Sequence, residues 1–385
     1  MIVNRMPAIT WHKFKGNDAE IELPALSAPE VAAISFSVPP ALQFTETTVN
    51  EGTSLEAGTA PVTGAFDEAL AAASAIDEWE TGMGKDGQAW LQTASTRKLS
   101  VVVPAGHKEE KPLVVRVEAQ DGAAAVAAVD VVLQAGAALK LAVHVDSPVS
   151  GNGLAGCALR LVVGDGAQLD LSSIQTLDNS WIHLDDTGVF LGEGARFTSS
   201  QTVLGAAESY TGFAADLSGR EAEAVVDTRY LGHDANKIDF NYVIRQRGVQ
   251  TNCTLTANGV LMDSSAKVLR GTIDLIHGAK GAIGQENETV LLVNEDVRNK
   301  TIPIILCDED DVQGAHGATI GHVNPEQLGY MQTRGLTPEQ TEDLFAVAAF
   351  DYAQVNAFDA QVRHAVERLG VATLGSTYEL LAEED

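Results

Sequence analysis

Cysteine and basic residues are scarce in this chain of 385 residues, and aromatic residues make up only 5% of it. The three cysteines, Cys157, Cys253 and Cys307, lie far apart and show no Cys-x-x-Cys spacing. An odd and scattered set argues against both a disulfide framework and an autonomous zinc site. The cysteine pattern therefore fits a reducing compartment.

Positive charge is also in short supply, with 25 Lys and Arg against 53 Asp and Glu and a formal net charge of −28. Phosphate backbones and anionic membranes would repel such a chain, so we expect neither nucleic acid nor a membrane as a partner. No window reaches the roughly 18–20 apolar residues of a membrane span. Met1 to Pro7 lacks the basic and apolar regions of an export signal. These features predict a cytoplasmic protein.

The first 98 residues are punctuated by proline and show no sustained pattern. One helix is expected there, over residues 67–80, because acids occupy its first turn and Leu70, Ala73 and Ile76 share one face. We therefore assign residues 1–98 to a small N-terminal region of mixed and helical structure.

From about residue 99 one phrase recurs: an aliphatic run, a turn of Gly, Asp or Glu, and a strand that alternates apolar with polar residues. The aliphatic residues before the turns are 30, 28, 26, 45 and 31 residues apart; they are Leu133, Val163, Leu191, Leu217, Met262 and Val293. Periods of 20–50 residues indicate stacked repeats. Turns are expected at Ala135-Gly136, Gly164-Asp165, Gly192-Glu193 and Asn294-Glu295.

Helical crossovers between these strands are missing, which disfavours a doubly wound α/β sheet. A sheet that coils upon itself pairs each strand with the coil above or below, so we predict a β-solenoid over residues 99–323. A β-sandwich is the alternative, because turn-rich alternation alone does not separate the two folds. The 45-residue interval is expected to hold either two short coils or one decorated coil.

Residues 324–385 predict a helical C-terminal domain. Pro325 and Pro338 each occupy the first position of an expected helix, with an acid next to the proline. The expected apolar stripes are Leu344, Val347 and Ala348 on the second helix and Phe358, Val362, Ala365, Val366 and Leu369 on a third.

His316 is the most promising metal-binding residue in the sequence. Small residues flank it on both sides, and imidazole nitrogen is a good ligand for iron. Cys307, at the end of an aliphatic run nine residues earlier, is either a small buried hydrophobe or a thiolate ligand. No Walker phosphate loop, His-Glu-x-x-His pair or Gly-x-Ser-x-Gly nucleophile elbow is present.

The region around His316 closely resembles the signature of the SufB/SufD family of iron–sulfur cluster assembly proteins, on its SufD side. The matching residues are Asp310, Asp311, Val312, His316, Gly317, Ala318, Thr319 and Gly321, then Gln327, Leu328, Tyr330, Arg334 and Gly335, with Gly271, Pro303 and the run Gln285 to Leu292 upstream. The similarity extends from about Tyr230 to Phe350. The SufD pattern has a cysteine two residues before the histidine, where this chain has Gly314.

This resemblance implies a mainly β fold, a right-handed parallel β-helix with a small N-terminal region and a helical C-terminal domain. It implies a non-enzymatic scaffold subunit of the SUF complex, on which iron–sulfur clusters are assembled and transferred. The cluster would be held transiently and shared with a partner subunit. His316 is then the main candidate ligand, and Cys307 contributes if its sulfur reaches the same metal.

The resemblance also implies partners. A SufB-type paralogue, or a second copy of this chain, would pair with the β-helix. A SufC-type ATPase would bind the C-terminal helices near Tyr330, Arg334 and Phe345 or Phe350. Two alternatives remain open: a β-helix carbohydrate-active enzyme, which the scarcity of aromatic residues disfavours, and a purely structural solenoid that binds other proteins.

Overall fold

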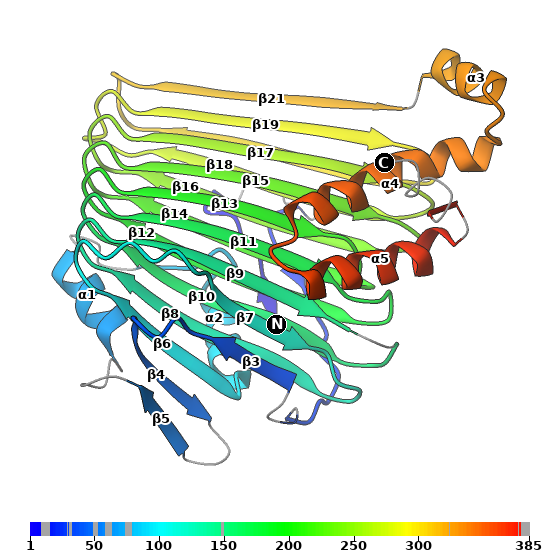
Figure 1. Cartoon of the computed structure of the whole chain (residues 1–385). Helices are drawn as coiled ribbons and strands as arrows, with labels where there is room; N and C mark the ends of the chain where they lie inside the picture. The colour runs from blue at the N-terminus through cyan, green and yellow to red at the C-terminus, as the bar shows by residue number, and fades with distance from the viewer. Residues whose placement is uncertain are drawn as a thin grey trace.

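A computed structural model describes residues 1–8, 16–28, 30, 33–48, 53–57, 64–73, 79–147, 150–322, 324–375 and 377–378. The fold is built mainly from two long sheets whose strands alternate along the chain (Figure 1). The first sheet has the strand order β20-β18-β16-β14-β12-β10-β8-β6-β4-β5, and the second has the order β21-β19-β17-β15-β13-β11-β9-β7-β3.

The strands of the first sheet are β4 (Gln43–Thr48), β5 (Thr53–Ala57), β6 (Arg97–Val103), β8 (Ala124–Leu133), β10 (Leu154–Val163), β12 (Ile182–Leu191), β14 (Glu208–Leu217), β16 (Lys237–Gln246), β18 (Ala266–Leu275) and β20 (Arg298–Cys307). Those of the second are β3 (Ile34–Ser37), β7 (Leu113–Glu118), β9 (Ala138–Asp146), β11 (Gln168–Thr176), β13 (Arg196–Val203), β15 (Glu223–Gly232), β17 (Asn252–Leu261), β19 (Ile283–Leu292) and β21 (Gln313–His322).

Strands β6 to β21 coil as a parallel β-solenoid, which confirms the predicted fold. Each coil places one strand in each sheet, and neighbouring coils pair in parallel along both sheets. The expected turns occur at or within one residue of the predicted positions. Gly136, Gly166 and Gly194 have φ of 67°, 61° and 60°, which explains why glycine recurs there.

The 45-residue interval holds neither two short coils nor one decorated coil, so that prediction was wrong. Leu217 is in register with Gln246, 29 residues later in the same sheet, whereas Met262 follows β17 in the other sheet. Gln246 occupies the interior position that an aliphatic residue takes in the earlier coils. Its amide donates to Thr251 Oγ1 and to the Ile283 carbonyl, both at 3.1 Å, so a polar residue is tolerated there.

The N-terminal region extends both sheets. β4 pairs antiparallel with β6, and β3 pairs antiparallel with β7. A separate pair, β1 (Ile2–Val3) and β2 (Ala19–Glu20), is antiparallel too. Two helices lie here, α1 (Ala65–Ala73) and α2 (Lys85–Ala94). The predicted helix at 67–80 corresponds to α1, although residues 74–78 lie outside the described residues, and α2 was not predicted.

Three helices follow the solenoid: α3 (Pro325–Thr333), α4 (Pro338–Asn356) and α5 (Ala360–Leu374). Pro325 and Pro338 begin α3 and α4 as expected, and α4 carries a capping box between Thr337 and Gln340. The predicted stripe of α4 was partly wrong, because Val347 is buried but Leu344 is half-buried and Ala348 exposed. The domain boundaries at residues 98 and 323 stay predictions.

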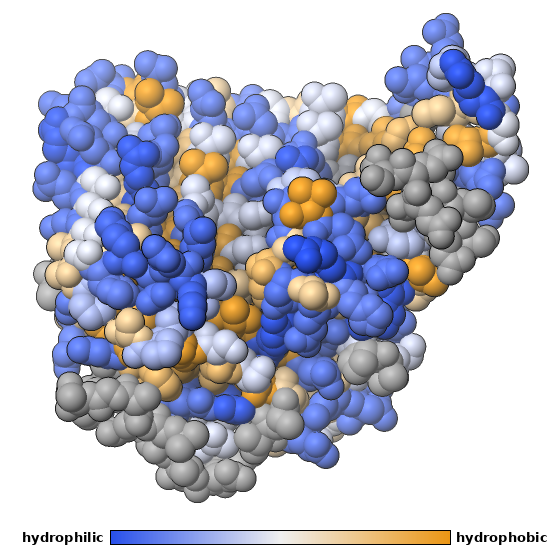
Figure 2. All heavy atoms as spheres, viewed as in Figure 1, coloured by the Kyte–Doolittle hydropathy of each residue, from blue (hydrophilic) through white to orange (hydrophobic). Residues whose placement is uncertain are grey.

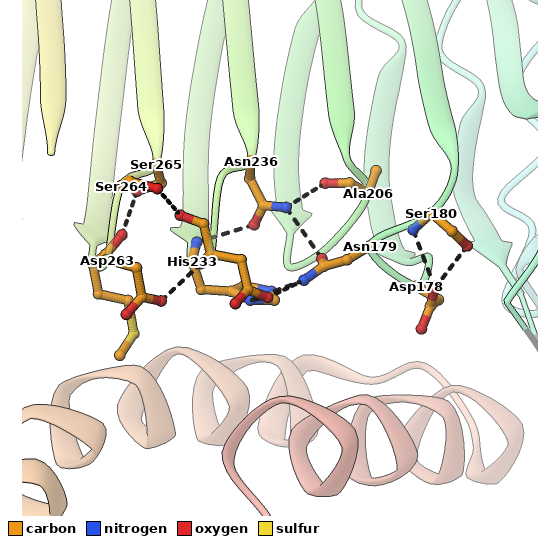
Figure 3. A network of polar contacts seen from close by, with 11 residues as sticks. Asp178, Asn179, Ser180, Ala206, His233, Asn236, Asp263, Ser264 and Ser265 are labelled. Atoms are coloured by element: carbon orange, nitrogen blue, oxygen red, sulfur yellow. Dashed lines mark hydrogen bonds and ion pairs between the residues drawn. The ribbon is translucent and has the colours of Figure 1, made fainter. Parts of the chain in front are cut away.

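Helices α4 and α5 rest on one edge of the solenoid, where a ladder of polar side chains joins successive turns (Figure 3). The Asn236 side chain donates to the Ala206 carbonyl at 2.8 Å and to Asn179 Oδ1 at 3.2 Å. The backbone N–H of Asp234 donates to Asp263 Oδ2 at 2.7 Å. These bonds tie each coil to the next, and so fix the surface on which the helices lie.

The interior is mainly aliphatic, but it also holds buried acids. Asp185, which shares the inward face of β12 with Val189, has an oxygen without a hydrogen-bond partner. Burial, with a smaller contribution from Asp186, raises the pKa of Asp185 to about 7. The folded chain therefore keeps a proton between about pH 4 and pH 7 that the unfolded chain has lost. This contribution to stability is full at low pH and is lost as the pH rises through 7.

Asp185→Asn should therefore stabilise the protein at pH 8, by roughly 2 kcal/mol or more, because the amide is never ionised. At pH 5 the gain should be much smaller, because the folded wild type still holds its proton there. Urea unfolding at the two pH values measures the effect, with the exposed Asp67→Asn as the control. Equal pH dependence in the wild type and Asp185→Asn would show that Asp185 is ionised throughout this range.

Candidate functional site

The candidate site lies at the end of the solenoid where both sheets stop. β20 is the last strand of the first sheet and β21 the last strand of the second, so each has one edge without a partner strand in the described residues (Figure 1). All ten residues of β21 are exposed. The free edge of a strand of this length is a template for pairing with another chain. We call this surface, formed by β20 and β21, the open end.

His316 faces the interior of the solenoid at the open end. β21 pairs in parallel with β19, and His316 is in register with Glu286. Glu286 and Glu288 are buried while Asn287 between them is exposed, so the face that carries Glu286 is the inner one. His316 shares that face, and it is exposed because no further coil covers it.

Cys307 is not brought to His316. A Cβ on Gly314 would lie 3.2 Å from both Leu275 and Ile305, and Cys307 is in register with Leu275, so Cys307 lies near Gly314. His316 is two residues further along the strand than Gly314, so the Cα atoms of these two residues lie about 7 Å apart. The Cys307 thiol instead donates to the Glu309 carbonyl at 3.3 Å. Among the described residues, no three His, Cys, Asp or Glu side chains converge as a metal site.

Charged side chains fill the coil directly beneath the open end, a feature that the sequence reasoning missed. Lys267 forms an ion pair with Glu288, and both side chains are 0% exposed. Tyr230 donates a hydrogen bond to the same Glu288 oxygen at 3.3 Å. Burial raises the pKa of Glu286 to about 7; Glu288 raises it further and Lys267 opposes the shift. Burial lowers the pKa of Lys267.

The predicted ATPase-binding residues fall into two groups. Tyr330 lies on α3 and Arg334 caps its C-terminal end; this helix has no buried residue and stands away from the solenoid (Figure 1). Phe345 is half-buried and lines a groove of about 340 Å³ with Arg229 and Tyr352. Phe350 is completely buried against the solenoid, so it offers no surface to a partner.

A family model described as the SufBD core domain of SUF-system FeS cluster assembly matches residues 115–350. This chain belongs to the SufBD family. The match covers the solenoid from β7 onward, the open end, and the helical segment up to Phe350. The expected resemblance is confirmed, and it reaches further toward the N-terminus than residue 230.

Individual relatives agree with the family. The chain is 25% identical over 185 residues to the iron-sulfur cluster assembly protein SufD of Bacillus subtilis, which covers 48% of this chain and 42% of that protein. It is 24% identical over 202 residues to a SufBD family protein of Pyrococcus horikoshii, covering 49% and 45% of the two chains. It is 22% identical over 166 residues to SufD of Escherichia coli, covering 43% and 39%. The matched part is thus less than half the length of each of these relatives.

A membrane-spanning helix needs about 20 predominantly apolar residues. Among the described residues, no helix of this SufBD-family chain is both long and apolar enough to cross a bilayer.

Proposed function

We propose that this SufBD-family chain is a non-enzymatic scaffold subunit of a SUF-type machinery, on which iron–sulfur clusters are assembled before transfer. The observation that carries the proposal is the open end: two strands, each with one edge that has no partner among the described residues, in the segment that matches the family, with His316 on the inner face of β21. The relatives named above are themselves described as iron-sulfur cluster assembly proteins.

The open end would be covered by a second β-solenoid, either a SufB-type paralogue or another copy of this chain. Pairing there would satisfy the free backbone groups of β20 and β21. It would also cover Ile320, a large apolar side chain on β21 that is 45% exposed. In such an interface the strands of the partner would continue the two sheets of the solenoid.

His316 would contribute one ligand to a cluster shared across that interface. In the described residues, no three His, Cys, Asp or Glu side chains form a complete metal site on this chain. A site divided between two chains is chemically reasonable for a scaffold, because the cluster must be released as well as held. The iron and sulfide are substrates of the assembly, so the site need not bind them tightly.

The test is His316→Ala, co-expressed with the partner proteins. It should reduce the cluster content of the complex several-fold, because one ligand is lost, while subunit association stays unchanged. His322→Ala, on the same exposed strand, is the matched control and should retain the wild-type cluster content. Iron, sulfide and visible absorbance measure the content. Normal cluster content in His316→Ala would remove the histidine from the proposed site.

The C-terminal helices would bind a SufC-type ATPase. α3 supports this role, because none of its residues is buried and most of its surface is available to a partner. α4 and α5 are anchored to the solenoid through a cluster that includes Leu204, Leu231, Val347 and Val366. Forces from the ATPase could thus reach the solenoid through α4.

A further inference from the structure

Of the two buried carboxylates on β19, Glu286 is the one that lies directly beneath His316. Glu286 on β19 is 2% exposed, and its Oε2 atom has no hydrogen-bond partner. Leaving a buried acceptor without a donor costs about 1–3 kcal/mol, and more when it is charged. An unsatisfied group in this position therefore needs an explanation.

A glycine on the opposite sheet makes room for this carboxylate. A Cβ on Gly271 of β18 would lie 2.0 Å from Glu286 Oε1 and 2.7 Å from its Oε2. Any other residue at position 271 would overlap the carboxylate. The glycine thus provides the space that lets Glu286 lie across the interior.

His316 is the neighbour best placed to satisfy Glu286. On the other side, β17 places Leu255 in register with Glu286, and leucine has no donor. On β21 the inward-facing neighbours of His316 are Gly314 and Ala318, which have none either. Lys267, the nearby cation, pairs with Glu288. The ring N–H of His316 is therefore the side-chain donor that β21 can bring to this carboxylate.

We propose that Glu286 is a positioning residue for His316: the exposed ring turns so that one ring N–H donates a hydrogen bond to the free Glu286 oxygen, which leaves the other ring nitrogen to face the open end with its lone pair. This inference rests on the proposed role of His316 and adds the group that orients it. Histidine ligands commonly donate their second ring N–H to a carboxylate, which fixes the tautomer and the ring orientation.

The experiment is NMR of the chain with ¹⁵N-labelled histidine at pH 8, where an imidazole is neutral. The wild type should show one predominant tautomer for His316, with a ring N–H signal protected from exchange with water. The signal is assigned by its loss in His316→Ala. Without a hydrogen bond, the ring N–H of so exposed a histidine exchanges too fast to be seen, so an absent signal in the wild type overturns the inference.

Variants show that the effect depends on the carboxylate oxygen. Glu286→Leu should remove the protected signal, because the acceptor is lost while the volume is kept. Glu286→Gln should keep it, because the amide oxygen still accepts. Asn287→Ala, exposed on the same strand, should change nothing. A signal that persists in Glu286→Leu contradicts the inference.

The outcome is separable from that of the proposed function. Normal cluster content in His316→Ala would refute the role of the histidine, whatever the tautomer. A freely exchanging His316 ring would refute the role of Glu286, even if His316→Ala lost its clusters.

Discussion

Lys267→Met is expected to lower the free energy of unfolding by about 3–5 kcal/mol, because it leaves Glu288 as an uncompensated charge in the interior. Lys267 and Glu288 are both 0% exposed, and the lysine also lies 5.8 Å from the centre of the Tyr230 ring. Methionine keeps much of the volume, so the effect reports the lost charge rather than a cavity. Urea unfolding monitored by circular dichroism measures it.

The double variant Lys267→Met/Glu288→Gln separates the pair from the rest of the core. It removes both charges and keeps an acceptor for the Tyr230 hydroxyl, so most of the lost stability should return. Lys237→Met is the matched control, because Lys237 pairs with Glu208 at 2.6 Å but is 62% exposed. Its cost should stay below about 1 kcal/mol. Equal losses in Lys267→Met and Lys237→Met would show that water reaches the interior pair.

The solenoid could be predicted because its local signals repeat. Three successive coils end in an aliphatic run and a turn glycine of positive φ, and each turn is followed by alternating residues. Prediction failed where the interior became polar. Gln246 replaces the aliphatic residue of the repeat, and one of the two hydrogen bonds that stabilise it there goes to Ile283 of the neighbouring coil.

The candidate site was only partly predictable from the sequence. His316 stands in a distinctive motif, so a single stretch of sequence was enough to select it. Glu286 lies in a run of polar residues, Gln285 to Glu288, in which nothing shows which side chains face inward. Glu286 becomes a candidate only through the register of β19 with β21 and through the space that Gly271 leaves for its carboxylate. Both depend on residues far apart in the sequence.

Burial also decides which of the predicted docking residues can act. Phe350 was predicted to lie near the ATPase contact, but it packs against Tyr378 with ring centres 5.5 Å apart and is inaccessible. Removing the whole tail would expose Leu204, Leu231 and Met262 on the solenoid, so a truncated chain would lose more than a docking surface. Substitutions on α3 avoid this problem, because that helix buries nothing.

Tyr330→Ala/Arg334→Ala should weaken binding of a SufC-type ATPase by about 30-fold or more, since Tyr and Arg at interface centres each contribute about 2 kcal/mol when they act as anchors. The two side chains contact each other in the free chain: Arg334 Nη2 donates to the Tyr330 hydroxyl at 2.6 Å, and the guanidinium lies 5.0 Å from the ring centre. The pair is thus pre-organised on the surface, with Tyr330 55% exposed.

Calorimetry or surface plasmon resonance with the purified ATPase measures the affinity. Gln332→Ala, an exposed substitution between the two residues on the same helix turn, should bind as the wild type does. The unfolding midpoint of the double variant should not change, because no buried contact is lost. An unchanged affinity in Tyr330→Ala/Arg334→Ala would exclude α3 as the docking surface. The groove lined by Phe345 and Tyr352 would then be the next candidate for the docking surface on these helices.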